Sequence, residues 1–291
     1  MAFDLLEPAA ADRFVTARDG LKLHVRDYAP AGAESGLPVI CLHGLTRNGR
    51  DFERVAPRIA ALGRRTLALD VRGRGHSDRD PKPENYAPNV YAADVLEVMD
   101  AFDVPCAVFV GTSMGGIITM MLAYGVKGRV AAAVLNDVGP VLEEKGLARI
   151  ATYVGKTMRF ASWDEAQAAV KEAQGAVFPH ADDMFWAEFA RRVCRQDADG
   201  GVSFDYDPAI ARPLATTKPV DMTPLFEALG DAPVLVVRGA LSDLLSGEGV
   251  ELMRIVRPDL ESVEVPGVGH APTLEEEPAW LAMIDFLAKA P

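Results

Sequence analysis

Val108-Phe-Val-Gly-Thr-Ser-Met-Gly-Gly116 is the stretch of sequence that decides the fold of this 291-residue chain. An apolar run typical of a buried strand ends in Gly-x-Ser-x-Gly, and a helical segment follows at once. This order of strand, sharp turn and helix is that of a nucleophile elbow, which presents a serine hydroxyl at the tip of the turn. A side chain at Gly111 or Gly115 would collide where strand and helix cross closely. Ser113 is therefore a candidate nucleophile, although ordinary strand-to-helix turns carry the same motif.

A serine hydroxyl is a weak nucleophile near neutral pH, so it needs a base to take its proton and an acid residue to orient that base. In folds built around such an elbow, the nucleophile, the acid and the base follow one another in the chain as Ser, Asp or Glu, and His. His270 is the candidate base, because it lies in Pro266-Gly-Val-Gly-His-Ala-Pro272, directly after a strand-like run. Asp243 is the favoured acid, because it follows the apolar run that ends at Arg238. Asp137, which follows the strand after the elbow helix, is the main alternative.

Attack on an acyl carbon creates an oxyanion, which requires two N–H donors. The backbone of Met114, at the start of the elbow helix, is expected to supply one of them. The other is expected from the loop His43-Gly-Leu-Thr46, where we choose Leu45. His43 itself is interpreted as a packing residue that supports this loop and does not transfer protons.

Composition narrows the classes of function. A formal net charge of −12 argues against a nucleic-acid surface. The chain has no Cys-x-x-Cys, His-Glu-x-x-His or Gly-x-Gly-x-x-Gly motif, so neither a metal nor another cofactor is expected. Three scattered cysteines are no disulfide framework, and Cys41 and Cys106 are expected to be buried. With no signal-peptide pattern and no apolar run long enough to span a membrane, we expect a cytoplasmic protein that binds a small-molecule substrate as a monomer or homodimer.

Strand-like apolar runs alternate with helical segments through most of the chain, as in β-α-β units around a largely parallel sheet. A hairpin is predicted over residues 13–28, where polar and apolar residues alternate. Buried strands are predicted over residues 38–42, 65–70, 107–110, 129–135, 233–238 and 262–265. Helices are predicted over residues 51–62, 87–102, 114–124, 248–256 and 278–288.

Residues 141–217 interrupt this alternation, because they have helical patterns and no buried strand. Helices are predicted there over residues 142–159, 162–174 and 182–195. The segment is rich in aromatic side chains, which either hold its helices together or face a pocket. Trp163 and Trp186 are the candidates for a substrate pocket.

These motifs together resemble the α/β-hydrolase fold of the lidded serine-hydrolase type. The resemblance rests on His43-Gly44, on Asp70-Val-Arg-Gly-Arg-Gly-His-Ser-Asp78, on the elbow, on Gly239-Ala-Leu-Ser-Asp243 and on Gly269-His-Ala-Pro272. It implies a mostly parallel eight-stranded sheet flanked by helices, with residues 1–140 and 218–291 as the core and 141–217 as a helical lid. It also implies Ser113 as nucleophile, His270 as base and Asp243 as the orienting acid.

The resemblance leaves the substrate open. The leading hypothesis is a hydrolase of a small or medium, partly apolar carboxylic ester or lactone. The alternatives are a carbon–carbon bond hydrolase acting on an aromatic-degradation product, and a non-catalytic receptor that reuses the pocket. A carbon–carbon hydrolase needs further polar groups, for which Arg47, Arg72 and Arg74 are candidates.

Overall fold

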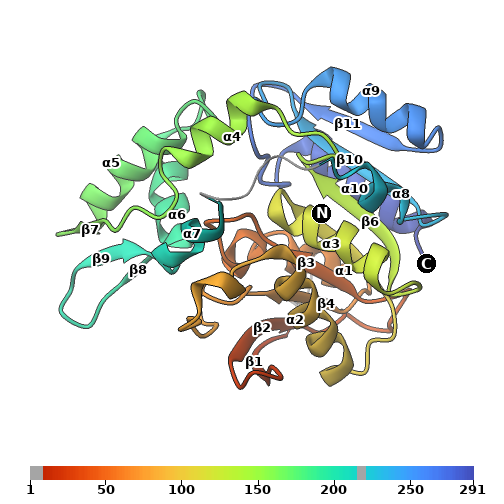
Figure 1. The fold of residues 1–291 in the computed structure, drawn as a ribbon, viewed down its shortest axis with the longest axis horizontal. Helices are drawn as coiled ribbons and strands as arrows, with labels where there is room; N and C mark the ends of the chain where they lie inside the picture. The colour runs from red at the N-terminus through yellow and green to blue at the C-terminus, as the bar shows by residue number, and fades with distance from the viewer. Residues whose placement is uncertain (1–8, 215–220) are drawn as a thin grey trace, which may run out of the picture.

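The computed structural model describes residues 9–214 and 221–291. Within these residues, eight strands form one sheet in the order β1-β2-β4-β3-β5-β6-β10-β11 (Figure 1). The strands are β1 (Ala10–Thr16), β2 (Lys22–Tyr28), β3 (Val39–Leu42), β4 (Thr66–Leu69), β5 (Ala107–Thr112), β6 (Val130–Asn136), β10 (Val234–Gly239) and β11 (Glu261–Val265). Only the β1–β2 and β2–β4 pairs are antiparallel among these described strands. The predicted fold class is confirmed.

Helices cover both faces of the sheet, because successive side chains of each central strand point to opposite sides. Ile40 and Leu42 of β3 belong to one apolar cluster, and Val39 and Cys41 belong to the other. The first cluster packs against α2 (Pro88–Ala101), α3 (Met114–Gly125), α8 (Thr223–Glu227) and α9 (Gly247–Val256). The second packs against α1 (Ala56–Ala61) and α10 (Glu277–Lys289). Both faces are therefore buried, as the continuous apolar runs of the strands require.

Two predictions for the sheet domain differ from the structure. The helix predicted over residues 51–62 is a 3-10 turn, η1 (Gly49–Phe52), followed by the short α1. A second 3-10 turn, η2 (Pro83–Asn85), precedes α2. Cys41 is buried as predicted, whereas Cys106 is only half-buried just before β5.

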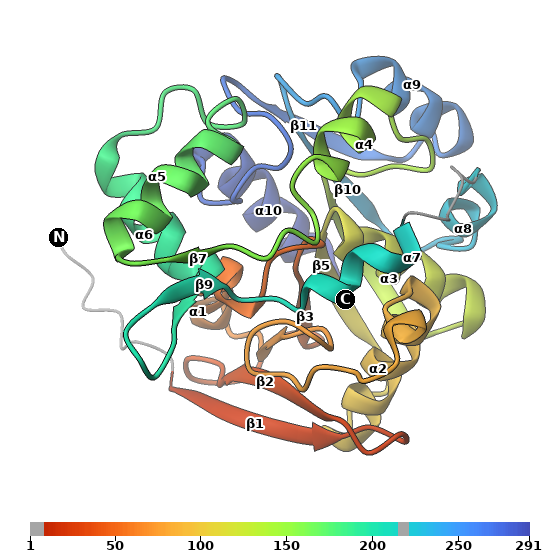
Figure 2. The same ribbon diagram turned by 60° about the vertical axis from the view of Figure 1, so that its left-hand side comes forward.

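Residues 141–214 form an insertion between β6 and β10, beside the edge at which β6 ends (Figure 2). Its helices are α4 (Glu144–Ala151), α5 (Trp163–Gln174), α6 (Asp183–Val193) and α7 (Ala211–Leu214), with the 3-10 turn η3 (Pro208–Ile210). It also contains a small antiparallel sheet of β7 (Arg159–Phe160), β9 (Val202–Phe204) and β8 (Cys194–Gln196). The sequence predicted helices and no buried strand here, so this sheet was missed, and the helix predicted over residues 142–159 ends at Ala151. Its predicted end at residue 217 lies outside the described residues.

Polar contacts join the insertion to the sheet domain. Arg192 of α6 pairs with Glu53 (3.0 Å) and with Glu275 (2.6 Å), which come from opposite ends of the chain. Arg50 donates to the carbonyl oxygens of Arg191 (2.7 Å) and Cys194 (3.0 Å). These contacts hold α6 and β8 against the segment that follows β3.

Candidate active site

The strand–turn–helix geometry at Ser113 matches the prediction from sequence. Ser113 lies between β5 and α3 with φ 51° and ψ −111°, a strained backbone conformation for a residue other than glycine. A Cβ atom on Gly111 would lie 2.5 Å from the backbone of Gly115, and one on Gly115 would lie 2.0 Å from the carbonyl oxygen of Leu42. The two glycines therefore allow β3, β5 and α3 to approach closely, and this approach presents Ser113 at the end of its strand.

His270 contacts Ser113 and an aspartate with its two ring nitrogens. Nε2 lies 2.9 Å from Ser113 Oγ, and Nδ1 lies 2.7 Å from Asp137 Oδ2. Because a carboxylate accepts, Nδ1–H is the donor to Asp137, and Nε2 is left to accept from the serine hydroxyl. This is the tautomer that a general base for serine requires.

Asp137 is completely buried and follows β6, the strand beside β5. Its Oδ1 accepts from the backbone N–H of Gly239 (2.8 Å), and its Oδ2 also accepts from Ser242 Oγ (2.5 Å). The preceding residue, Asn136, donates to Thr112 Oγ1 (3.0 Å) and to the carbonyl oxygen of Pro272 (2.8 Å). Asn136 therefore ties the His270 loop to the elbow, a contact that no sequence motif indicated.

The expectation that Asp243 orients His270 is wrong for this structure. Asp243 instead forms a two-pronged ion pair with Arg149 of α4, with Nε–Oδ2 at 2.6 Å and Nη2–Oδ1 at 2.8 Å. The hydrogen bonds from Arg149 hold the pKa of the Asp243 carboxyl below its usual value. Asp137 follows β6, the strand beside the elbow strand β5, whereas Asp243 follows β10, which lies one strand further from the elbow.

The two expected oxyanion donors remain available. Within the described residues, neither the N–H of Leu45 nor that of Met114 donates a hydrogen bond. Arg74, which is buried, fixes both residues, since its Nε donates to the carbonyl oxygen of Leu45 (3.0 Å) and its Nη2 lies 3.7 Å from Met114 Sδ. Arg74 thus holds in place the two residues expected to donate to the oxyanion.

His43 supports the same loop, as the sequence predicted. Its Nδ1 donates to the carbonyl oxygen of Gly44 (2.7 Å), and its Nε2 accepts from the N–H of Val71 (3.0 Å). Burial lowers the pKa of His43 to about 4, so the ring is neutral near neutral pH.

A cavity of about 340 Å³ lies between the Leu45 loop and the insertion. Thr46 and Arg47, which directly follow Leu45, form one wall. The place where a Cβ of Gly44 would stand is 3.5 Å from Arg47 Cγ and 3.9 Å from Ser113 Cβ, so this wall adjoins the nucleophile. The other walls come from the insertion, through Thr152, Tyr153, Lys156, Met158, Ala169, Val170, Glu172, Ala173, Gln174, Phe189, Val193, Phe204 and Tyr206. We call this cavity the cleft.

Neither tryptophan that the sequence suggested lines the cleft. Trp186 is 1% exposed and packs among Phe178, Phe185 and Phe189. Trp163 lies under the guanidinium of Arg191, at 4.6 Å. The expected pocket role of these residues is therefore not met at the cleft, and Phe189 faces it instead.

Of the three arginines that the sequence suggested for substrate binding, the cleft uses one. Arg47 lines it and is oriented by Asp51 (Nε–Oδ1 2.9 Å) and by the ring of Phe189 at 4.2 Å. Arg72 is buried and forms ion pairs with Asp19, Asp80 and Asp94, and Arg74 binds the Leu45 loop.

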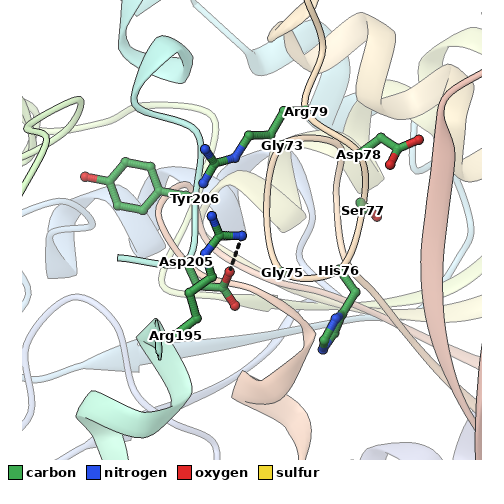
Figure 3. A pocket seen from close by; sticks show the side chains of 9 residues that line it. All are labelled: Gly73, Gly75, His76, Ser77, Asp78, Arg79, Arg195, Asp205 and Tyr206. Atoms are coloured by element: carbon green, nitrogen blue, oxygen red, sulfur yellow. Dashed lines mark ion pairs between the residues drawn. The ribbon is translucent and has the colours of Figure 1, made fainter. Parts of the chain in front are cut away.

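A second, polar pocket of about 490 Å³ has neither Ser113 nor His270 in its lining (Figure 3). It is lined by the loop after β4 (residues 73 and 75–79) and by Arg195, Asp205 and Tyr206 of the insertion. Arg195 faces Asp205 there, while the ring of Tyr206 points away.

Comparison with known proteins identifies the family. The sequence profile of the alpha/beta hydrolase family matches residues 39–284. The chain belongs to this family. A 3-hydroxybutyrate-oligomer hydrolase of Cupriavidus necator is 37% identical over 255 residues, which are 84% of this alpha/beta hydrolase and 86% of the relative. A 2-(acetamidomethylene)succinate hydrolase of Mesorhizobium japonicum is 29% identical and covers 92% of each chain.

Solved structures agree with this family. The crystal structure of an alpha/beta hydrolase from Novosphingobium aromaticivorans has 43% sequence identity and a TM-score of 0.90, and covers 96% of this chain and 98% of its own. Within the residues that the structure describes, this alpha/beta hydrolase has no group of acidic, histidine or cysteine side chains that could hold a metal ion. No helix in the same residues is long and apolar enough to cross a membrane.

Proposed function

We propose that this chain is a serine hydrolase that cleaves carboxylic esters through an acyl-enzyme, with Ser113, His270 and Asp137 as its catalytic triad. The observation that carries this proposal is the pair of contacts on His270, 2.9 Å to Ser113 Oγ and 2.7 Å to Asp137. These contacts connect nucleophile, base and acid in the order that serine catalysis needs.

The reaction then takes place in two halves. Ser113 Oγ attacks the ester carbonyl carbon while His270 Nε2 accepts its proton, and the N–H groups of Leu45 and Met114 stabilise the oxyanion. Collapse of this intermediate breaks the bond to the alcohol oxygen, which takes the proton from His270 and leaves. Water next attacks the acyl carbon, gives its proton to His270 and releases the acid, and the proton returns to Ser113.

The cleft favours an ester with an apolar acyl part and a charged end. Phe189, Val170 and Met158 give it apolar walls, whereas Arg47 and Lys156 bring two cations. Arg47 Nη1 makes no hydrogen bond within the described residues, and Lys156 is exposed, so both can bind a carboxylate. Similarity to a 3-hydroxybutyrate-oligomer hydrolase supports the same class, a short ester of a hydroxy acid. In this proposal the insertion acts as a lid over the triad.

The test uses p-nitrophenyl butyrate and a serine-directed fluorophosphonate. We expect the wild-type protein to turn over the ester and take the label, and Ser113→Ala to lose both while keeping its fold. A variant that kept wild-type activity would show that Ser113 is not the nucleophile. If the wild type cleaves vinylogous diketones and no esters, the carbon–carbon hydrolase alternative is correct, and if it neither hydrolyses nor labels, the receptor alternative is correct.

A further inference from the structure

Helix α4 is docked on the turn that follows β10, next to the proposed triad. The N–H of Glu143 donates to the carbonyl oxygen of Leu244 (2.9 Å). A Cβ on Gly146 would lie 2.6 Å from the carbonyl oxygen of Asp243, so only a glycine lets the helix come this close. One turn further along α4, Arg149 holds both carboxylate oxygens of Asp243. The insertion thus delivers a guanidinium to a carboxylate of the sheet domain.

Asp243 belongs to a turn that packs against the His270 loop, because the N–H of Leu241 donates to the carbonyl oxygen of Val268 (2.8 Å) and a Cβ on Gly239 would lie 2.4 Å from the carbonyl oxygen of Gly269. The pKa of Asp243 is held low first by the hydrogen bonds from Arg149 and also, more weakly, by the charge of His270. The pKa of Arg149 is raised, chiefly by its hydrogen bond to Asp243. A raised pKa on the guanidinium and a lowered pKa on the carboxyl both favour the ionised pair. Ser242, the neighbour of Asp243, donates to Asp137 itself.

Other charged or titratable groups lie on the elements packed against the His270 loop. Asp137 faces Nδ1 from the end of β6, and its second oxygen is bound by the N–H of Gly239. Arg238 of β10 binds Glu264 and the carbonyl oxygen of Leu245. His180 of the insertion lies against Gly267, at the start of the His270 loop. Asp243 is thus a second carboxylate beside this loop, and its partner Arg149, unlike those of Asp137, comes from the insertion.

We propose that Arg149 is a positioning residue of the reaction, because it neutralises Asp243 and so leaves His270 facing a single uncompensated carboxylate, Asp137. Two uncompensated carboxylates would stabilise the imidazolium and leave less of the neutral base that takes the serine proton. Because Arg149 belongs to α4, His270 is a competent base when the insertion is docked and a poorer one when α4 moves away. The inference rests on the proposed serine chemistry.

The test is a double-mutant cycle on the pH dependence of kcat/KM with p-nitrophenyl butyrate. Arg149→Met leaves the Asp243 charge uncompensated. We therefore expect the acid limb of the profile, the pH range over which kcat/KM rises, to move up by ~0.5–1 pH unit, the size of effect of one nearby charge in a partly solvated site. Asp243→Asn leaves the Arg149 charge uncompensated, so the limb moves down. The double variant lacks both charges, and its limb returns to the wild-type position.

The control is Arg159→Met, which removes an exposed arginine of the same insertion that pairs with Asp199 (2.5 Å). It changes the net charge equally and leaves the limb in place. An unmoved limb in Arg149→Met, or a double variant that does not return, overturns the inference, because a merely structural contact lowers activity without this pattern. If Arg149→Met does not fold, a limb in Asp243→Asn that fails to move down has the same force.

An NMR titration of the His270 ring proton in the Ser113→Ala background gives the same comparison without catalysis. The His270 signal is assigned by its loss in His270→Gln. Its midpoint shifts with the same signs if the inference is correct, even if the chain hydrolyses no ester. Failure of the proposed function and failure of this inference are therefore separate outcomes.

Discussion

At the residue scale, Asp137 and Asp243 follow neighbouring strands, and the partner of each sets what its carboxylate does. Asp137 accepts from an imidazole N–H, a hydroxyl and a backbone N–H, a set that keeps an anion buried and oriented. Asp243 has its charge matched by Arg149. The first arrangement orients the ring of His270, the proposed base, and the second holds α4 against the turn that follows β10.

We therefore expect the two aspartates to respond very differently to amide substitution. Asp137→Asn keeps the shape but leaves His270 in the wrong tautomer, so kcat should fall by about 10⁴-fold. Asp243→Asn should stay within about tenfold of the wild type at its own optimum pH, because the Asp137 contact remains. Steady-state kinetics on both variants, with folding checked by circular dichroism, make the comparison. A larger loss in Asp243→Asn would return the orienting role to that residue.

The sequence could not show which of the two aspartates contacts His270, for a physical reason. Both aspartates follow apolar strands, and chain order permits either one. What separates them is the lateral order of the strands and an arginine 94 residues away, and neither is a local property. Ser113 and His270, by contrast, lie in glycine-bounded turns whose conformation is encoded locally, and the structure brings the two together.

His43 gives a prediction about stability. Its pKa is about 4 in the folded protein and near 6.5 in an unfolded chain, so the unfolded state binds more protons between these values. The free energy of unfolding therefore falls as the pH drops from about 6.5 to 4, by a contribution of about 3 kcal/mol. Urea unfolding at pH 7 and pH 4.5 measures it.

The control for this prediction is His43→Gln, which has no charge to gain. Groups such as His24, whose pKa is raised against its burial by the hydrogen bonds it donates to Asp70 and Asp12, act equally in both proteins and cancel in the difference. The variant should be less stable at pH 7 and should lose less stability on acidification. Equal losses in the two proteins would show that His43 does not titrate in this range.

At the element scale, period and length explain which structure the sequence could reveal. The buried strands are continuous apolar runs, and the long helices have helical spacing, so both follow from the pattern. Strands β7, β8 and β9 have two or three residues each and include Arg159 and Arg195. Such short, half-polar strands have no period to detect, and their pairing comes from the fold of the insertion.

The aromatic cluster of α6 predicts a difference between two of its members. Phe189 faces the cleft, so Phe189→Leu should enlarge it and shift the optimum toward longer acyl chains, each buried methylene being worth about 0.8 kcal/mol, or a few-fold in kcat/KM. Trp186 lies behind it, so Trp186→Phe should lower Tm by creating a void and leave the shape of the profile unchanged. p-Nitrophenyl esters from acetate to decanoate give the profiles. Identical profiles of kcat/KM against acyl length in all three proteins would show that Phe189 does not line the acyl site.

At the scale of the whole molecule, the insertion and the sheet domain share the site. The sheet domain supplies Ser113, His270, Asp137 and the loop of the proposed oxyanion donor Leu45, and the insertion supplies most walls of the cleft. Two sets of contacts hold them in register, Arg149 with Asp243 on α4 and Arg192 with Glu53 and Glu275 on α6. Loss of either set should therefore affect catalysis as well as stability.

Arg192→Met tests this coupling away from the triad. Arg192 is 5% exposed and its partners Glu53 and Glu275 are partly exposed, so its loss should cost about 1–3 kcal/mol. We expect a lower Tm, faster limited proteolysis within residues 141–214, and reduced kcat/KM with an unmoved acid limb, because the Arg149–Asp243 pair is untouched. Arg191→Met is the matched control, since the neighbouring Arg191 lies over Trp163 within the insertion. If the two variants are cleaved by the protease at the same rate and have the same kcat/KM, the contacts of Arg192 do not hold the insertion over the site.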